Sequence, residues 1–240
     1  MKIYVNGCSF TYGDELSKPS DSAWPAQLAT RLQATVTNDA ISGGTNARTV
    51  YRTVKHLQDK YDLYIVAWTT NTRFTFYHAN NNHDVNFNPM LLNGLYGHES
   101  YYQEWGQILY RYWYNELYAF KLWLQQIIQL QSILEQQKKQ YLMVNTMGNN
   151  LSQWLAPKDQ FIESVKSLIN FDSLNNEQIF DEYKEIQYYA SLINKDMFYK
   201  WDTFVIQQLN LNFKRGPGGH FLEEGHAHLS ELLYQHLCLK

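Results

Sequence analysis

Cysteine, proline and long apolar runs are all scarce in this sequence. The 240 residues include two cysteines, Cys8 and Cys238, at opposite ends of the chain, so no disulfide framework is expected and both thiols are predicted to be reduced. No apolar stretch approaches the roughly 20 residues that a membrane-spanning helix needs, and the N-terminal sequence MKIYVNGCSF lacks a signal-peptide pattern. We therefore expect a soluble, cytoplasmic protein that has no membrane partner.

An excess of charge of one sign is also absent. The chain carries 20 Lys and Arg against 23 Asp and Glu, for a formal net charge of −3, and no basic run marks a nucleic-acid-binding face. Nucleic acid is therefore not an expected partner. Hydrophobic residues make up 45% of the sequence and charged residues 18%, which is typical of a globular chain. Because the length suits one α/β domain, we expect a single domain over residues 1–240.

Short apolar runs alternate with helical patterns along the chain. Strands are predicted at residues 2–6, 36–37, 63–68 and 141–146. Helices are predicted at residues 23–33, at about 109–137 and at 223–238. A further helix is predicted to begin at a cap formed by Thr45 or Asn46. This β-α-β-α-β order predicts a parallel sheet with right-handed crossovers, that is, an α/β fold. Residues from about 74 to 108 are rich in aromatic side chains and Asn and show no clear periodicity. They are predicted to be an insertion that is either a lid or poorly ordered.

The strongest chemical signal comes directly after the first predicted strand. The sequence Gly7-Cys8-Ser9-Phe10-Thr11-Tyr12-Gly13 places a serine at the carboxyl end of a strand, where open α/β sheets bind their ligands. The flanking glycines allow a sharp turn that exposes the Ser9 Oγ atom and brings backbone N–H groups close to a reacting oxygen. Taken alone, the motif is more often typical of a glycine-rich turn with a solvated serine.

A histidine near the other end of the chain complements this serine. His220 follows the glycine-rich sequence Gly216-Pro217-Gly218-Gly219 and precedes the last predicted helix. From such a loop its ring can reach the crevice at the first strand and act as a general base. In isolation, His220 is equally consistent with a histidine in a surface loop. The combination of Ser9 and His220 therefore carries the prediction of nucleophilic catalysis.

These motifs resemble the sequence blocks of the SGNH or GDSL hydrolases, a family of serine esterases, lipases and deacetylases. The first block, Gly-Asp-Ser followed by a glycine, is similar to Gly7, Cys8, Ser9 and Gly13, with Cys8 in place of the aspartate. In the second block, the segment from Asn38 to Ser42 leads to Gly43. Both blocks occur in the order that the family has.

The remaining two blocks are less complete. The third, usually Gly-x-Asn-Asp, corresponds to Thr69-Thr70-Asn71-Thr72, so that Asn71 is kept while the glycine and the aspartate are lost. The last, usually Asp-x-x-His-Pro followed by Gly-His, matches His220 and Gly225-His226. Pro217 takes the position of the acid, or Gly218 if the spacing is one residue shorter.

The resemblance implies a flavodoxin-like, three-layer α/β/α sandwich and acyl-transfer chemistry. Ser9 would attack an ester carbonyl after His220 removes its proton, and the N–H groups of Ser9 and Gly43 and the side-chain amide of Asn71 would form the oxyanion hole. Water would release the acyl group, so no cofactor is expected. The expected partner is a small-molecule or carbohydrate ester. Carbohydrate O-acetyl groups are one candidate substrate, suggested by the aromatic insertion.

The acid that normally supports the histidine of this family is missing, which leaves three alternatives open. A backbone carbonyl of the loop at residues 214–219 accepts the proton on Nδ1, giving a Ser-His dyad, and this is the alternative that we favour. Asp202 is the nearby carboxylate that could replace the acid. In the third alternative the site is inactive, and the fold serves as a binding or structural module.

Rival interpretations of the same residues are weaker. His220, His226 and His228 could form a metal cluster, but one catalytic base and helix residues explain their spacing better, so no metal is expected. Cys8 could be a thiol nucleophile, but its side chain points away from that of its neighbour Ser9. A nucleotide-binding flavodoxin-like protein would need a phosphate-binding lysine, which the Ser9 loop lacks.

Overall fold

The chain divides into two compact units. The computed structural model describes residues 1–78, 83–87, 100–168 and 175–239. The first unit comprises Met1–Thr70, Ser132–Gly148 and Asn194–Lys240, and the second comprises Asn71–Gln131 and Asn149–Ile193. The single domain expected over residues 1–240 stays a prediction.

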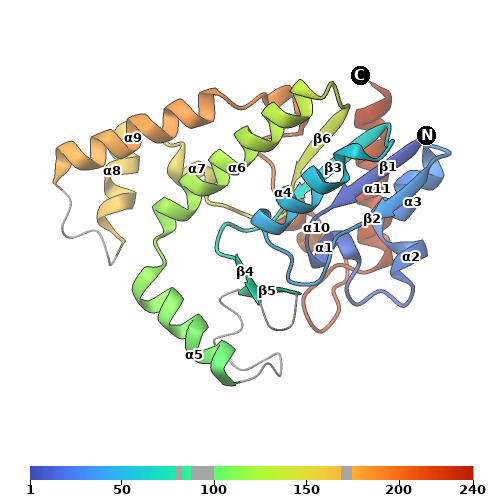
Figure 1. Cartoon of the computed structure of the whole chain (residues 1–240), viewed down its shortest axis with the longest axis horizontal. Coiled ribbons are helices and arrows are strands. Elements are labelled where there is room, and N and C mark those ends of the chain that lie inside the picture. The colour runs from blue at the N-terminus through green and yellow to red at the C-terminus, as the bar shows by residue number, and fades with distance from the viewer. Residues whose placement is uncertain (79–82, 88–99, 169–174, 240) are drawn as a thin grey trace. The chain divides into compact units, whose positions relative to one another are not determined.

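The first unit is built on a sheet of five parallel strands (Figure 1). The strands are β1 (Lys2–Asn6), β2 (Thr35–Asn38), β3 (Leu63–Trp68), β6 (Tyr141–Asn145) and β7 (Phe198–Tyr199), in the order β2-β1-β3-β6-β7. Counted along the chain within this sheet, the order is 2-1-3-4-5, which is that of flavodoxin-like folds. The predicted α/β class and parallel sheet are therefore confirmed. β7 is absent from the strands that the sequence predicts, because two residues are too few to show a pattern.

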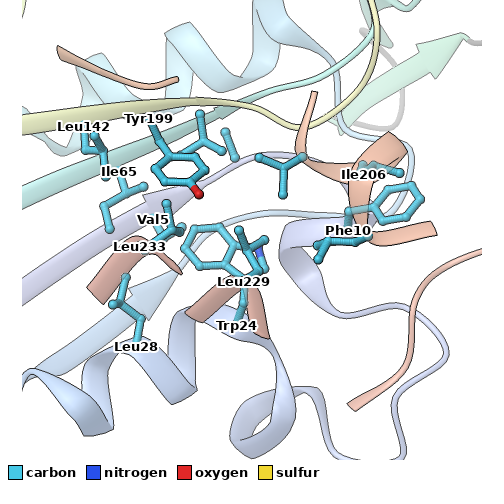
Figure 2. Close-up of a cluster of buried hydrophobic side chains, with 14 of the residues drawn as sticks. Val5, Phe10, Trp24, Leu28, Ile65, Leu142, Tyr199, Ile206, Leu229 and Leu233 are labelled. Atoms are coloured by element: carbon cyan, nitrogen blue, oxygen red, sulfur yellow. The ribbon is translucent and has the colours of Figure 1, made fainter. Parts of the chain in front are cut away.

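Helices cover both faces of this sheet, because successive residues of a strand point to opposite sides. Figure 2 shows one face, where side chains of β1 and β3 pack against α3 (Trp24–Arg31) and α11 (Glu223–Cys238). The residues at this interface include Val5, Ile65, Trp24, Leu28, Leu229 and Leu233. On the other face, the Asn6 side-chain amide donates to the Thr49 carbonyl of α4 (Asn46–Lys55) over 3.4 Å. The predicted helix at residues 223–238 matches α11.

The buried side of α4 is polar and not apolar. Thr45 caps the helix through a hydrogen bond from the Arg48 N–H to its Oγ1 atom, at 3.2 Å, as one of the two predicted caps. Asn46, Arg48 and Thr49 are buried, whereas the apolar residue Val54 is 36% exposed. The Asn46 side chain both donates to the Thr69 carbonyl and accepts from its N–H. The buried polar groups therefore bind the backbone at the ends of neighbouring strands.

The shorter elements of the first unit connect these layers. They are α1 (Ser9–Tyr12), α2 (Pro19–Ser22), the 3-10 helices η1 (His56–Gln58) and η4 (Lys195–Met197), and α10 (Val205–Asn212). None of the helices in the described part of the chain combines the length and the apolar character of a membrane-spanning segment.

The second unit begins with part of the predicted insertion. β4 (Phe74–His78) and β5 (His83–Phe87) form an antiparallel hairpin, and α5 (Ser100–Ile108) follows. The described part of the insertion is therefore regular structure, and residues 79–82 and 88–99 lie outside the described residues. The unit also contains the π-helical η3 (Leu109–Trp113), most of α6 (Glu116–Gln136), α7 (Leu151–Trp154), α8 (Lys158–Lys166) and α9 (Asn176–Ser191).

The long helix predicted at about 109–137 is interrupted near its start. Tyr114 has an extended backbone, with ψ of 131°, and ends η3. The Asn115 side chain then accepts a hydrogen bond from the Tyr118 N–H at 2.8 Å, so α6 begins with an asparagine cap at this position. Trp113 lies before the break and is 77% exposed. The prediction of one continuous helix is therefore wrong over its first two turns.

Candidate active site

Ser9 lies shortly after the end of β1 and is the first residue of α1. The strand order reverses between β1 and β3, and flavodoxin-like folds bind ligands at this point. Ser9 is itself buried, at 4% exposure, so the expected exposure of its Oγ atom is not found, and its neighbour Cys8 lies in the apolar core. A Cβ atom on Gly7 would lie 2.9 Å from that of Ala67, so glycine allows the segment to pass close to β3. The Cys8 side chain belongs to the apolar cluster of the core.

The His220 ring is held by a carboxylate that the sequence analysis did not identify. Glu15 lies in the turn after α1, and its Oε2 atom is 2.9 Å from the His220 Nδ1 atom. The same oxygen accepts the His220 backbone N–H at 3.0 Å, and Oε1 accepts the Gly218 N–H at 2.6 Å. The two side chains are only 20% and 15% exposed. Glu15 thus binds both the ring and the loop that carries it.

This geometry corrects the expected partner of His220. The loop turns N–H groups of Gly218 and His220 inward towards Glu15, and the His220 carbonyl accepts the Gly216 N–H within the loop at 2.8 Å. The favoured Ser-His dyad supported by a loop carbonyl is therefore wrong. Asp202, the other candidate, is exposed in the turn after β7, and the carboxylate at Nδ1 is that of Glu15.

The glycines of the loop make room for the Glu15 carboxylate. A Cβ atom on Gly216 would lie 2.5 Å from Oε1, and one on Gly218 would lie 3.1 Å from Oε2. Glu15 itself has a φ of 69°, in the left-handed region that residues other than glycine seldom adopt. This conformation belongs to the turn that follows α1, and Gln33, Lys138, Asn150 and Lys200 share it elsewhere in the chain.

Hydrogen bonding keeps Glu15 ionised. Burial raises the pKa of its carboxyl group, but the N–H groups of Gly218 and His220 and the His220 ring favour the charged form more strongly. The net effect is a pKa below the ordinary value for glutamate. The group facing His220 Nδ1 is therefore a carboxylate at neutral pH.

The rest of the His220 ring lies against the segment of Ser9. The ring of Phe10, the residue after Ser9, has its centroid 4.4 Å from that of His220. Across the described residues, neither Ser9 Oγ nor His220 Nε2 makes a hydrogen bond, so no bond joins the two in this structure. Catalytic hydrogen bonds are often long or absent before substrate binds.

The Gly43 loop also lies against the segment of Ser9. A Cβ atom on Gly44 would be 2.6 Å from the Gly7 carbonyl oxygen and 3.3 Å from the Cys8 Cα atom, so the two backbones are in close contact. Gly43 has a φ of 67° with open space beside it. The Ser42 hydroxyl donates to Asp14, the residue before Glu15. The loop is thus anchored next to the nucleophile.

Asn71, the third predicted donor of the oxyanion hole, begins the second unit. Its backbone N–H donates to the Asn149 side-chain oxygen at 2.7 Å, within that unit. This bond holds the backbone of Asn71. Its part in the oxyanion hole stays a prediction.

A partly buried ion pair supports the strand ends behind the site. The Asp39 carboxylate accepts two hydrogen bonds from the Arg52 guanidinium, both at 2.8 Å, and one from the Tyr4 hydroxyl at 2.8 Å. Burial raises the pKa of Asp39, but these donors lower it by more than burial raises it. The net pKa of Asp39 is therefore below the ordinary value. Arg48 donates to the Asp39 carbonyl at 3.0 Å. The network therefore fixes the end of β2, from which the Gly43 loop begins.

His226 has a structural partner in the core. Its Nδ1 atom accepts the Trp24 backbone N–H at 3.0 Å, and its ring lies 4.3 Å from that of Phe221 between centroids. Throughout the described ranges, no three His, Cys, Asp or Glu side chains gather as a metal site would require.

Comparison with solved structures places this fold. The esterase EstA from Pseudoalteromonas sp. is 10% identical, with a TM-score of 0.50, over 99% of this chain and 97% of that chain. A member of the lipolytic protein G-D-S-L family from Veillonella parvula DSM 2008 is 12% identical, with a TM-score of 0.48 over 98% and 96%. The acetyl xylan esterase AlAXEase is 11% identical, with a TM-score of 0.46 over 98% of each chain.

The fold is shared with EstA, and its parallel sheet with flanking helices is the one expected from the resemblance to SGNH hydrolases. At 10% identity this likeness concerns the fold alone. The chain itself belongs to the family of unknown function DUF6071, which it matches over residues 15–156. A search of curated proteins gives no match.

Proposed function

We propose that this protein is a cofactor-independent serine hydrolase that cleaves carboxylic esters, with Ser9 as nucleophile and His220 as general base. The observation that carries the proposal is that His220 is held against the segment of Ser9 at two points, the Phe10 ring and the Glu15 carboxylate. A histidine of a solvated surface loop needs neither contact. The ring nitrogen that is left without a partner, Nε2, is the atom that a base uses towards serine.

The reaction would proceed in two steps through an acyl-enzyme. His220 Nε2 takes the proton of Ser9 Oγ as this oxygen attacks the ester carbonyl, and the same proton then passes to the leaving alcohol. The N–H groups of Ser9 and Gly43 and the side-chain amide of Asn71 would stabilise the oxyanion. Water, activated by His220, then releases the acid and restores Ser9.

The substrate is an ester of a small molecule or a carbohydrate. The sequence of the insertion at about residues 74–108 is rich in aromatic residues, and such rings stack well on sugars. Acetylated carbohydrates therefore belong in the substrate panel beside short activated acetate esters.

Labelling with a fluorophosphonate tests the nucleophile. We expect one equivalent of probe on Ser9, with both labelling and hydrolysis of an activated acetate ester lost in Ser9→Ala. Cys8→Ala is the matched control, since its buried thiol should not react, and it should keep the labelling. Stoichiometric labelling that survives Ser9→Ala would refute the assignment. No labelling and no hydrolysis in the wild type would instead support the alternative of a binding or structural module.

A further inference from the structure

We propose that Glu15 is the positioning residue for His220, and that it replaces, from the N-terminal segment, the acid that SGNH hydrolases carry just before their histidine. Glu15 touches neither the ester nor Ser9 Oγ in this role, and it acts through the imidazole. The inference rests on the proposed function and adds the third member of the catalytic group.

The contact with Nδ1 determines where the ring carries its proton. An ionised carboxylate only accepts hydrogen bonds, so the 2.9 Å contact with Oε2 requires a proton on Nδ1. The neutral ring then has its lone pair on Nε2, the tautomer that a base for Ser9 needs. Once Nε2 has taken the proton from Ser9, the Glu15 charge stabilises the imidazolium.

The Glu15 site is built into the backbone and is not a casual surface pair. Its two oxygens accept three N–H groups, from Gly218, the His220 backbone and the His220 ring. Gly216 leaves the space that the carboxylate occupies, since a Cβ atom there would lie 2.5 Å from Oε1. Isolated surface ion pairs between flexible side chains have none of these constraints.

Glu15 is also tied closely to the nucleophile. The N–H groups of Gly13 and Asp14 both donate to the Ser9 carbonyl, at 2.8 and 3.1 Å, and Gly13 ends α1 with a φ of 97°. The nucleophile and the group that orients its base therefore share one short segment. In the family pattern, by contrast, the acid and the histidine share a segment and the serine lies apart.

The test is the tautomer of His220, measured by long-range ¹H–¹⁵N NMR, together with steady-state kinetics on an acetate ester. In the wild type we expect Nδ1–H. In Glu15→Gln this tautomer should no longer dominate, because the amide NH₂ can donate to Nδ1, and kcat should fall by roughly 10²- to 10⁴-fold with little change in KM. Glu15→Asp keeps the charge and should recover part of both signals. Glu224→Gln, an exposed glutamate in the first turn of α11, is the control and should change neither.

The outcomes separate this inference from the proposed function. An unchanged Nδ1–H tautomer in Glu15→Gln, or a fall in kcat no larger than that of Glu224→Gln, would overturn the role of Glu15. If Glu15→Gln does not fold, Glu15→Asp decides the question. An unchanged kcat in Glu15→Asp, together with loss of the Nδ1–H tautomer, would show that catalysis does not depend on this tautomer, and would refute the role of Glu15. A wild type that is not labelled at Ser9 refutes the proposed hydrolase, whereas the NMR comparison still decides whether Glu15 orients His220.

Discussion

The Trp24 backbone N–H donates to Nδ1 of His226, joining the start of α3 to the first turns of α11 across the core. His226 is fully buried, so its imidazole replaces water as the acceptor for an N–H at a helix start. Burial and, to a smaller extent, the charge of His220 lower the pKa of His226 to about 3. The ring is therefore neutral in the folded protein at all moderate pH values.

The first prediction follows from this pKa. Because unfolding returns His226 to an ordinary pKa near 6.5, the unfolded chain binds one more proton than the folded chain between pH 3 and 6.5. Stability is then complete above pH 6.5 and falls as the pH decreases, by up to about 1.4 kcal/mol per pH unit. Urea unfolding between pH 7.5 and about 4.5 would measure the slope. Carboxylates whose pKa is lowered by folding lose their contribution as the pH falls towards their ordinary values of 4.5 for Glu15 and 3.8 for Asp39, so they affect only the lower end of this range.

His226→Asn provides the comparison for this slope. Asparagine can still accept the Trp24 N–H through its side-chain oxygen, but it does not titrate. We expect the variant to be less stable at pH 7.5, since it loses ring contacts with Phe221, and to depend less on pH down to 4.5. An equal slope in both proteins would show that another group takes up the proton.

A second prediction concerns the glycine beside Glu15. In Gly216→Ala the new methyl group would meet the end of the Glu15 side chain at 2.5 Å, and the flexible carboxylate would move away from His220. We expect kcat on an acetate ester to fall towards that of the Glu15 variants, while the free energy of unfolding changes by less than about 1 kcal/mol.

Gly219→Ala should instead lower the free energy of unfolding and leave kcat nearly unchanged. Its added Cβ atom meets nothing within 4 Å, but its φ of 88° strains any other residue, at about 1–2 kcal/mol. Measurements of thermal unfolding and of kcat for Gly216→Ala and Gly219→Ala test these two expectations. If Gly216→Ala kept full activity, the fit between the loop and Glu15 would have no catalytic importance.

A third prediction concerns the Asp39 ion pair. Asp39→Asn removes the charge that faces the Arg52 guanidinium and leaves that guanidinium without its partly buried carboxylate partner. We expect a loss of about 2 kcal/mol in the free energy of unfolding, measured with urea, because two hydrogen bonds between charged groups are weakened. Asp59→Asn is the matched control, because Asp59 is 52% exposed at its contact with His56, and we expect it to cost less than about 1 kcal/mol. Equal losses would show that burial of the Asp39 pair adds nothing.

Much of the fold was predictable because its strands and helices have strong local patterns. β3 is a continuous apolar run, and α11 begins at the two acidic residues Glu223 and Glu224, so both were located from the sequence. β7 was not predictable, since its two residues pair with β6 only in the assembled sheet. The break at Asn115 depends on a cap, which an otherwise unbroken apolar stripe conceals.

The site was predictable in part, for a similar reason. Ser9 and His220 stand in motifs, whereas Glu15 lies in a turn without one and meets His220 only through the fold. Two signals were available: a glycine-rich loop with no acid of its own, and a carboxylate closely following the serine. The first signal suggests a source of carbonyl groups, whereas the loop in fact turns the N–H groups of Gly218 and His220 towards Glu15.

The last prediction concerns Asn71, the third donor of the proposed oxyanion hole. A single donor of this kind typically contributes about 10²- to 10³-fold to turnover, because it meets the charge that develops on the carbonyl oxygen. Since the Asn149 side chain holds Asn71 through its backbone N–H, Asn71→Ala should keep that hydrogen bond and the local conformation. We therefore expect kcat on an acetate ester to fall about 10²-fold with little change in the thermal unfolding temperature. Asn71→Asp is a sharper variant, because a carboxylate of similar shape would repel the oxyanion, and it should be at least as impaired as Asn71→Ala. Full activity in both variants would remove Asn71 from the hole and leave Ser9 and Gly43 as its donors.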